Sequence, residues 1–190
     1  MDIAGYLEKH VEVLNRVKED HASTILELAD VIVASLQAGG KLLVMGNGGS
    51  AADAQHFAAE LVGRFRKERK AIPAIALTTD SSILTAVGND YGFEMVYARQ
   101  VEALAAPGDV ICGISTSGRS PNVLQAVEAG RQRGCATVCL AGCDGGPLAA
   151  ATDVGLVVPS EETPHIQEAH VTVIHMLCAM IESRLTCQEG

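Results

Sequence analysis

Residues 41–60, KLLVMGNGGSAADAQHFAAE, decide the fold that we predict for this chain of 190 residues. Positions 42–45 are apolar without alternation, which is typical of a strand buried on both faces. The three glycines between 46 and 49 permit a tight turn, and Ser50 stands where the N-cap of a following helix is expected. Because the start of a helix presents free N–H groups and a positive dipole end, this turn is a predicted anion site.

The rest of the chain alternates short apolar runs with helical patterns. Further strands are expected at 71–78, 109–115, 136–141 and 154–159, helices at 93–104 and from about 164 to 185, a turn at Asn89 and Asp90, and an N-terminal helical arm over 1–37 made of one long helix or two stacked ones. This alternation predicts an α/β fold: a three-layer sandwich around a five-stranded parallel sheet of the flavodoxin-like type, in a single domain over 1–190. If the strand order is 2-1-3-4-5, ligands bind between strands one and three. The amphipathic arm must bury its apolar stripe, either on its own sheet or on a partner subunit.

Composition excludes several classes of function. The net charge of −9 and the pI near 5.1 argue against a nucleic-acid partner, and the basic residues within 64–70 are interpreted as a solvated helix end and turn. The N-terminus is acidic rather than signal-like, and no apolar run is long enough for a membrane span, so a cytoplasmic protein is expected. The cysteines sit mostly in apolar segments, and Cys139 and Cys143 lack the partners that a zinc finger needs.

A hydroxyl-rich loop follows the third expected strand, from Ser115 to Pro121. Ser120 is a predicted N-cap and Pro121 the first helical residue, so this loop is a second, neutral anion cradle. The alternative is a serine-rich loop with an ordinary helix cap. Because it falls beside the first turn at the switch point, we favour a phosphate site formed by both loops.

Positions 46–51 also match the GxGxxG/A fingerprint of dinucleotide-binding proteins. That fingerprint requires an acidic residue about twenty positions later to hold the ribose. Here that distance falls at 65–67, and the first acid after the second strand is Asp80. We therefore expect a phosphomonoester ligand and no nucleotide cofactor.

Four polar residues on two predicted helices are candidates for proton transfer or metal binding. His56 and Glu60 share one helix face, whereas Gln167 and His175 are eight residues apart, about 12 Å along a helix axis. Histidine and glutamate beside a bound sugar could move protons between adjacent carbons, and the whole set could hold a divalent ion. Each also has a plain structural reading: a histidine such as His56 or His170 bonded to a carbonyl, Glu60 paired with Arg64 at i+4, and Gln167 merely opening a helix.

Four motifs taken together resemble the sugar isomerase (SIS) domain, and within it the phosphoheptose isomerases. They are GNGGSAADAQHFAAEL at 46–61, TTDSSILTAVGNDYGFE at 78–94, GISTSGRSPNV at 113–123 and IQEAHVTVIH at 166–175. The resemblance implies isomerisation of sedoheptulose 7-phosphate to D-glycero-D-manno-heptose 7-phosphate, which leads to ADP-heptose for lipopolysaccharide. It also implies a zinc cofactor and a cytoplasmic homotetramer whose active sites use more than one subunit.

The resemblance assigns roles residue by residue. Substrate-binding positions are Asn47, Gly48, Gly49, Ser50, Glu60, Arg64, Asn89, Asp90, Ser115, Thr116, Ser117, Ser120 and Gln167; the proton-transferring pair is Glu60 and His175; the zinc ligands are His56, Glu60, Gln167 and His175. The implied reaction is an aldose-ketose isomerisation through an enediol(ate). The alternative is a non-catalytic SIS protein that binds the bacterial replication initiator or senses a sugar phosphate. Retention of Glu60 and His175 favours the enzyme.

Overall fold

A computed structural model describes residues 2–187 and contains the expected five-stranded parallel sheet, in the order β2-β1-β3-β4-β5. The strands are β1 Leu42–Gly46, β2 Ala74–Ala76, β3 Val110–Ser115, β4 Ala136–Gly142 and β5 Val154–Val158; the helices are α1 Ile3–Gln37, α2 Gly49–Val62, α3 Ser81–Tyr91, α4 Ala98–Leu104, α5 Pro121–Gln132, α6 Gly146–Ala151 and α7 Thr163–Thr186, with a 3₁₀ turn at Phe93–Met95. The strand order places the topological switch point between β1 and β3, as predicted.

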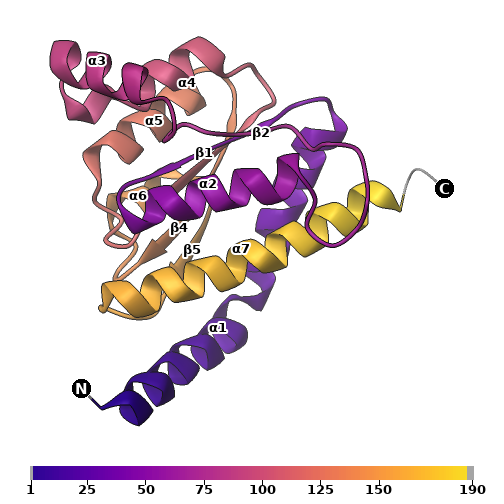
Figure 1. Ribbon diagram of the computed structural model, residues 1–190, viewed down its shortest axis with the longest axis vertical. Helices are drawn as coiled ribbons and strands as arrows, with labels where there is room; N and C mark the ends of the chain where they lie inside the picture. Colours follow the sequence, from indigo (N-terminus) through magenta and orange to yellow (C-terminus); the bar gives the residue numbers. More distant parts are fainter. Residues whose placement is uncertain (1, 188–190) are drawn as a thin grey trace.

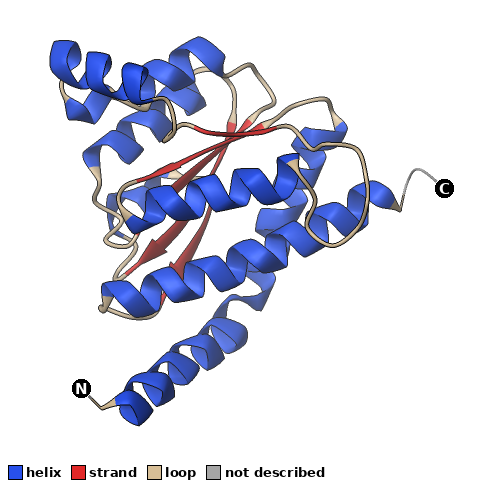
Figure 2. Cartoon of the chain, in the orientation of Figure 1, coloured by secondary structure: helices blue, strands red, loops and turns tan. Residues whose placement is uncertain are grey.

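Helices cover both faces of the sheet and form three layers (Figures 1 and 2). One core lies between the sheet and α1, α2 and α7; the other lies between the sheet and α4, α5 and α6. Every residue of β1 and β3 is buried, which explains their unbroken apolar sequence. The loops after these two strands therefore leave a rigid central platform.

The arm is one helix of 35 residues rather than two. Its buried residues include Val13, Val17 and Ile25, so its apolar stripe continues across the polar stretch at 18–23, which is mostly exposed. The helix packs on α7 and β5, and its N-terminal half lies beside the start of α7 at the lower edge of Figure 1. None of the helices in the described part of the chain is both long and apolar enough to span a bilayer.

Three local predictions were wrong. The strand expected at 71–78 is only Ala74–Ala76, because Pro73 has no N–H to give to a ladder and β2, at the sheet edge, pairs with β1 alone. The segment 93–104 divides into the 3₁₀ turn and α4. Asn89 and Asp90 are not a turn: they lie in the last turn of α3, which ends at Gly92, where φ is +93°.

Candidate active site

The first loop brings backbone N–H groups to the switch point. Gly48 adopts φ of +56°, and α2 begins at Gly49, so the helix starts before the residue that we expected to cap it. Ser50 is therefore a buried first-turn residue and not the N-cap, which is a correction to the sequence prediction. The free donors at this helix start still form a candidate anion site.

A pair of amides holds this loop against α5. The Asn47 Nδ2 donates to Asn122 Oδ1 at 2.9 Å, and the Asn122 Nδ2 donates back to Asn47 Oδ1 at 2.8 Å. The Tyr97 hydroxyl donates to the carbonyl oxygen of Gly46 at 2.6 Å. Sequence analysis missed Asn122 and Tyr97, because their partners lie 75 and 51 residues away.

The second loop closes as a compact hydroxyl cluster. Ser120 is the N-cap of α5 and Pro121 follows it at the helix start, as predicted. The Ser120 hydroxyl does not cap its own helix but lies 2.9 Å from the Ser115 hydroxyl. The Ser117 hydroxyl accepts from the Arg119 N–H at 3.2 Å. Gly118, with φ of +63°, leaves no room for a Cβ, which would lie 2.0 Å from the carbonyl oxygen of Gly145. Thr116 directly follows β3 in the same loop and is partly buried.

Three of the four acid, base and metal candidates meet between α2 and α7. The Nε2 atoms of His56 and His175 lie 2.8 Å apart, with their rings nearly edge to face. The Glu60 Oε1 lies 3.7 Å from His56 Nε2, one helical turn away. All three side chains are partly exposed, so a ligand can reach them.

This cluster fits a divalent ion of the zinc type. Two imidazole nitrogens at 2.8 Å either share a proton or flank a cation, and a carboxylate stands beside them. Across a tetrahedral zinc with bonds of about 2.0–2.1 Å, two ligand atoms are about 3.3 Å apart, so a small outward rotation of either ring would suffice. Cys178, on the neighbouring turn of α7, is no ligand candidate: burial, followed by the charge of Glu60, raises the pKa of its thiol to about 12.

Gln167 lies at the phosphate end of the site. A Cβ built on Gly49 would meet its Nε2 at 2.5 Å, so the Gln167 amide covers the start of α2. Its separation from His175 along α7 remains about 12 Å. The structure thus brings Gln167 to the anion loop, and the fourth metal ligand stays a prediction.

Three predicted substrate residues stand apart from these loops. Asn89 and Asp90 are exposed at the end of α3, where Asn89 Nδ2 donates to Asp90 Oδ1 at 2.7 Å. Arg64 is exposed on the loop after α2. The i+4 ion pair considered for Glu60 and Arg64 is not formed, because Glu60 faces His56 instead. These three residues are oriented towards solvent in the single chain.

Asp53 is a site residue that the sequence reading missed. It is a buried carboxylate on α2, three residues before His56, and its Oδ2 has no hydrogen-bond partner. Burial raises the pKa of Asp53 to about 6, against the opposing effect of His56. A buried carboxyl group with a raised pKa close to His56 marks Asp53 as a further candidate of this site.

A buried ion pair fixes the long loop that flanks His175. Glu182 on α7 accepts the backbone N–H groups of residues 65, 66 and 67 at 3.0–3.1 Å and the Arg69 Nε at 3.2 Å. Burial alone would raise the pKa of Glu182, but these donors outweigh it and lower the pKa. Arg69 also donates to three carbonyls around the end of α2, those of Glu60, Leu61 and Gly63, and to that of its neighbour Lys70.

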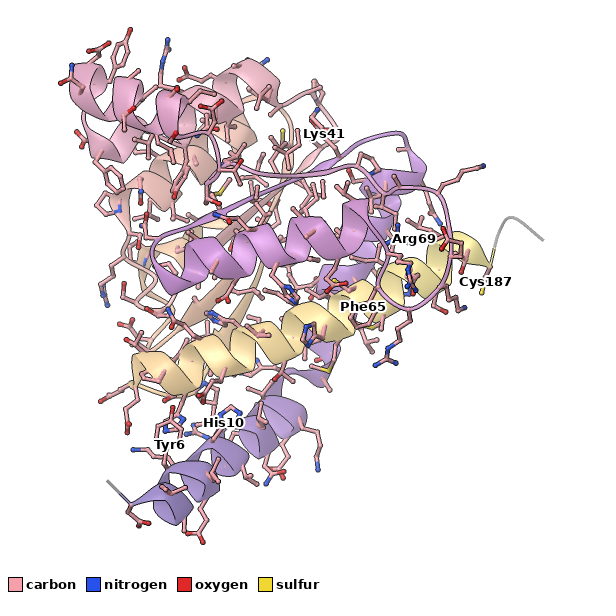
Figure 3. All side chains as sticks on the ribbon, viewed as in Figure 1. Tyr6, His10, Lys41, Phe65, Arg69 and Cys187 are labelled. Carbon is pink, nitrogen blue, oxygen red and sulfur yellow. The ribbon has the colours of Figure 1, made fainter. Side chains whose placement is uncertain are left out.

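The basic segment 64–70 is therefore more than a solvated turn, which corrects part of the sequence interpretation. The ion pair fixes Phe65, whose ring stacks on His175 with centroids 5.8 Å apart. Figure 3 shows Phe65 and Arg69 beside α7, on the loop that joins α2 to β2. The loop thus forms one wall around the catalytic candidate His175.

His170 has the plain structural reading considered for it. Its Nε2 lies 2.9 Å from the carbonyl oxygen of Ala141, and burial lowers its pKa to about 4. Its position between α7 and β4 makes it a neutral core histidine that donates to a strand end.

Comparison with known proteins gives the class first. The SIS domain family matches residues 5–142, which is most of the chain. An SIS domain agrees with the parallel sheet, the switch-point loops and the hydroxyl cradle described above.

Whole-chain relatives narrow this class. A phosphoheptose isomerase from Geobacter sulfurreducens is 56% identical over 184 residues, covering 97% of both chains. The structure of a phosphoheptose isomerase from Neisseria gonorrhoeae has 44% identity and a TM-score of 0.90, covering 95% of this chain and 97% of the other. One from Francisella tularensis has 40% identity and a TM-score of 0.92, covering 95% and 96%. The chain belongs to the phosphoheptose isomerase family of SIS-domain proteins, so the expectation of a sugar-phosphate isomerase is confirmed.

Proposed function

We propose that the chain interconverts sedoheptulose 7-phosphate and D-glycero-D-manno-heptose 7-phosphate through an enediol(ate). The observation that carries this proposal is the position of His56, Glu60 and His175 on two helices beside the switch-point loops. A phosphate held at one end and proton-transfer groups at the other suit a phosphorylated open-chain sugar.

The phosphate binds, in this proposal, between the starts of α2 and α5. Backbone N–H groups at 48–50 and the hydroxyls of Ser115, Ser117 and Ser120 supply the donors. Asn47, locked by Asn122, keeps the first loop in place, and Gln167 closes over Gly49. Arg119, the one charged residue of the second loop, is paired with Asp144, so the positive dipole ends of both helices supply the attraction for the phosphate.

The chemical step moves one proton from C1 of the ketose to C2 and one between the two oxygens. Glu60 and His175 are the residues that we assign to these transfers, one acting on carbon and the other on oxygen. Phe65 packs on the His175 ring and restricts its orientation.

Zinc is part of the proposal, with His56, Glu60 and His175 as ligands and Gln167 as a fourth. When bound, it would polarise the sugar carbonyl as a Lewis acid. The support within this chain is the nitrogen, nitrogen and oxygen donor set described above.

We further propose a cytoplasmic homotetramer with active sites at subunit interfaces, acting at the first step towards ADP-heptose. Ile3, Leu7 and Val11 form an exposed apolar stripe on α1. An apolar groove between α1 and α7, lined by residues such as Leu26 and Met176, lies on the same part of the molecule. A second copy that places its stripe in this groove would bury both, as an isologous contact requires.

The exposed Asn89 and Asp90 support the same assembly, because substrate-binding residues that face solvent in one chain can complete the site of another. Light scattering on a Leu7→Glu/Val11→Glu variant tests it, with exposed Glu19→Gln as the control. The variant should fall below tetramer mass; an unchanged mass would remove this face from the assembly.

The reaction is tested by incubating purified protein with sedoheptulose 7-phosphate and following the aldose by NMR. We expect the aldose to form, a chelator to suppress its formation, and added zinc to restore it. Ligand-induced thermal stabilisation without product would identify a sugar-phosphate binding protein instead.

A further inference from the structure

A second cluster of metal-binding side chains lies where α1 crosses the start of α7. His10 comes from α1, whereas His165 and Glu168 come from α7, and one nitrogen or oxygen atom of each lies within 4.8 Å of the other two. Figure 3 labels Tyr6 and His10 in the space between these helices. On α7, His165 precedes His175 by ten residues, about 15 Å along the axis, so this cluster is separate from that of His56, Glu60 and His175. Gln167 lies between His165 and Glu168 in sequence, but its amide covers the start of α2.

Each histidine of this cluster has one buried ring nitrogen without a hydrogen-bond partner. The His165 side chain is 1% exposed, and its Nε2 has no partner. The His10 Nδ1 lies 3.1 Å from Glu168 Oε2, yet outside hydrogen-bond geometry, and is also without a partner. Buried polar nitrogens are normally satisfied, so the unpartnered His10 Nδ1 beside the Glu168 carboxylate indicates a missing ligand there.

Only His165 and Glu168 of these three residues are hydrogen-bonded to each other, and the distances among the three also fit a metal ion. Glu168 Oε2 lies 3.1 Å from His10 Nδ1 and 3.3 Å from His165 Nδ1. Ligand atoms on a tetrahedral zinc are about 3.3 Å apart, and two imidazoles with one carboxylate are a common zinc donor set. His165 and Glu168 are three residues apart on one helix, so both project towards α1.

Surrounding residues orient the ligands as they do in known metal sites. The Tyr6 hydroxyl donates to Glu168 Oε1 at 2.9 Å, which leaves Oε2 for the ion. The Glu162 carboxylate lies 3.8 Å from His165 Nε2, the nitrogen opposite the proposed ligand atom, and is itself paired with Lys9. A carboxylate that hydrogen-bonds the second ring nitrogen fixes the tautomer and orientation of a ligating histidine, and Glu162 would reach this position after a small side-chain rotation.

We propose that His10, His165 and Glu168 bind a divalent ion of the zinc class, which fastens the N-terminal arm to α7. Two ligands on one helix and one on the other make the ion a cross-link between elements far apart in sequence. The ion would order the half of α1 that carries the exposed stripe at Ile3, Leu7 and Val11.

The test uses the full chain with the active-site histidines replaced, His56→Ala/His175→Gln, so that it is independent of the proposed function. Metal-stripped protein is titrated with Zn²⁺ by calorimetry and with Co²⁺ by its visible absorption. One ion per chain should bind, and Zn²⁺ should raise the melting temperature. Adding His10→Ala should weaken binding by at least about 100-fold and abolish the thermal shift.

Two controls keep the result decisive. His21→Ala removes another histidine of α1 and should change neither readout. The His10 side chain is only partly buried, so the His10→Ala variant remains informative if a variant at the buried His165 misfolds. In the chain with its active-site histidines intact, His10→Ala should remove one bound ion. Absence of binding in the active-site background, or binding that His10→Ala leaves unchanged, would overturn the proposal.

Discussion

His56 on α2 and His175 on α7 face each other with their Nε2 atoms 2.8 Å apart, and Glu60 stands 3.7 Å from His56. Residues 119 positions apart thus form one cluster beside the anion loops. Because all three are partly exposed, their replacement should affect chemistry more than folding.

Glu60→Gln and His175→Gln should each lower kcat by about 10²- to 10⁴-fold, the usual contribution of a positioned acid or base. The oligomer mass and melting temperature should change little. His21→Gln, on α1, is the matched control. Near wild-type kcat in either variant would remove that residue from the mechanism.

Ser120→Ala should raise KM for the phosphorylated sugar by about 10- to 100-fold, because a hydrogen bond to a charged group contributes about 1.5–3 kcal/mol. Its hydroxyl lies 2.9 Å from that of Ser115, so Ser115→Ala should act in the same direction. Steady-state kinetics measure both, with exposed Ser23→Ala on α1 as the control. An unchanged KM in both variants would place the phosphate elsewhere.

Glu182→Gln should destabilise the fold by about 3 kcal/mol, because it leaves buried Arg69 without its counter-charge. It should also lower kcat, since the loop that it anchors carries Phe65 against His175. Urea unfolding and kinetics on one preparation separate the two effects. Exposed Glu161→Gln should stay within about 0.5 kcal/mol of the wild type. A stable Glu182→Gln variant with normal kcat would contradict this role for the ion pair.

Asp53→Asn should change stability in a pH-dependent way. Its pKa is raised from 3.8 to about 6 on folding, so the folded state holds the proton more tightly, and ionisation costs folding free energy as the pH rises from about 4 to above 6. The variant should therefore gain stability relative to the wild type at pH 8, by about 1–3 kcal/mol more than at pH 4. Thermal unfolding at the two pH values measures the difference. An effect of equal size at both would mean that Asp53 does not titrate in this window.

The sequence predicts those parts of this site that depend on short-range pattern. Unbroken apolar runs identify buried strands, and the glycine turn and the Ser120-Pro121 pair mark helix starts. The predicted N-cap of α2, Ser50, was wrong by two residues. The observed N-cap is Gly48, whose positive φ lets the helix begin at Gly49.

Contacts between distant segments could not be read in this way. The pairs Asn47 with Asn122 and Glu182 with the 65–67 backbone join residues 75 to 117 positions apart. Nothing in local periodicity distinguishes the buried Asp53 from an exposed helix residue. Asn89 and Asp90 have turn-forming side chains, but the actual stop is Gly92.

The central claim is that Glu60 and His175 transfer the protons of a heptose phosphate isomerisation. Sedoheptulose 7-phosphate should be incubated in D₂O with the wild type, Glu60→Gln and His175→Gln, and the products followed by NMR. The account predicts that the wild type forms the aldose with deuterium at C2, and that each variant is at least about 100-fold slower. No aldose from the folded wild-type oligomer, or equal rates in all three proteins, would contradict it.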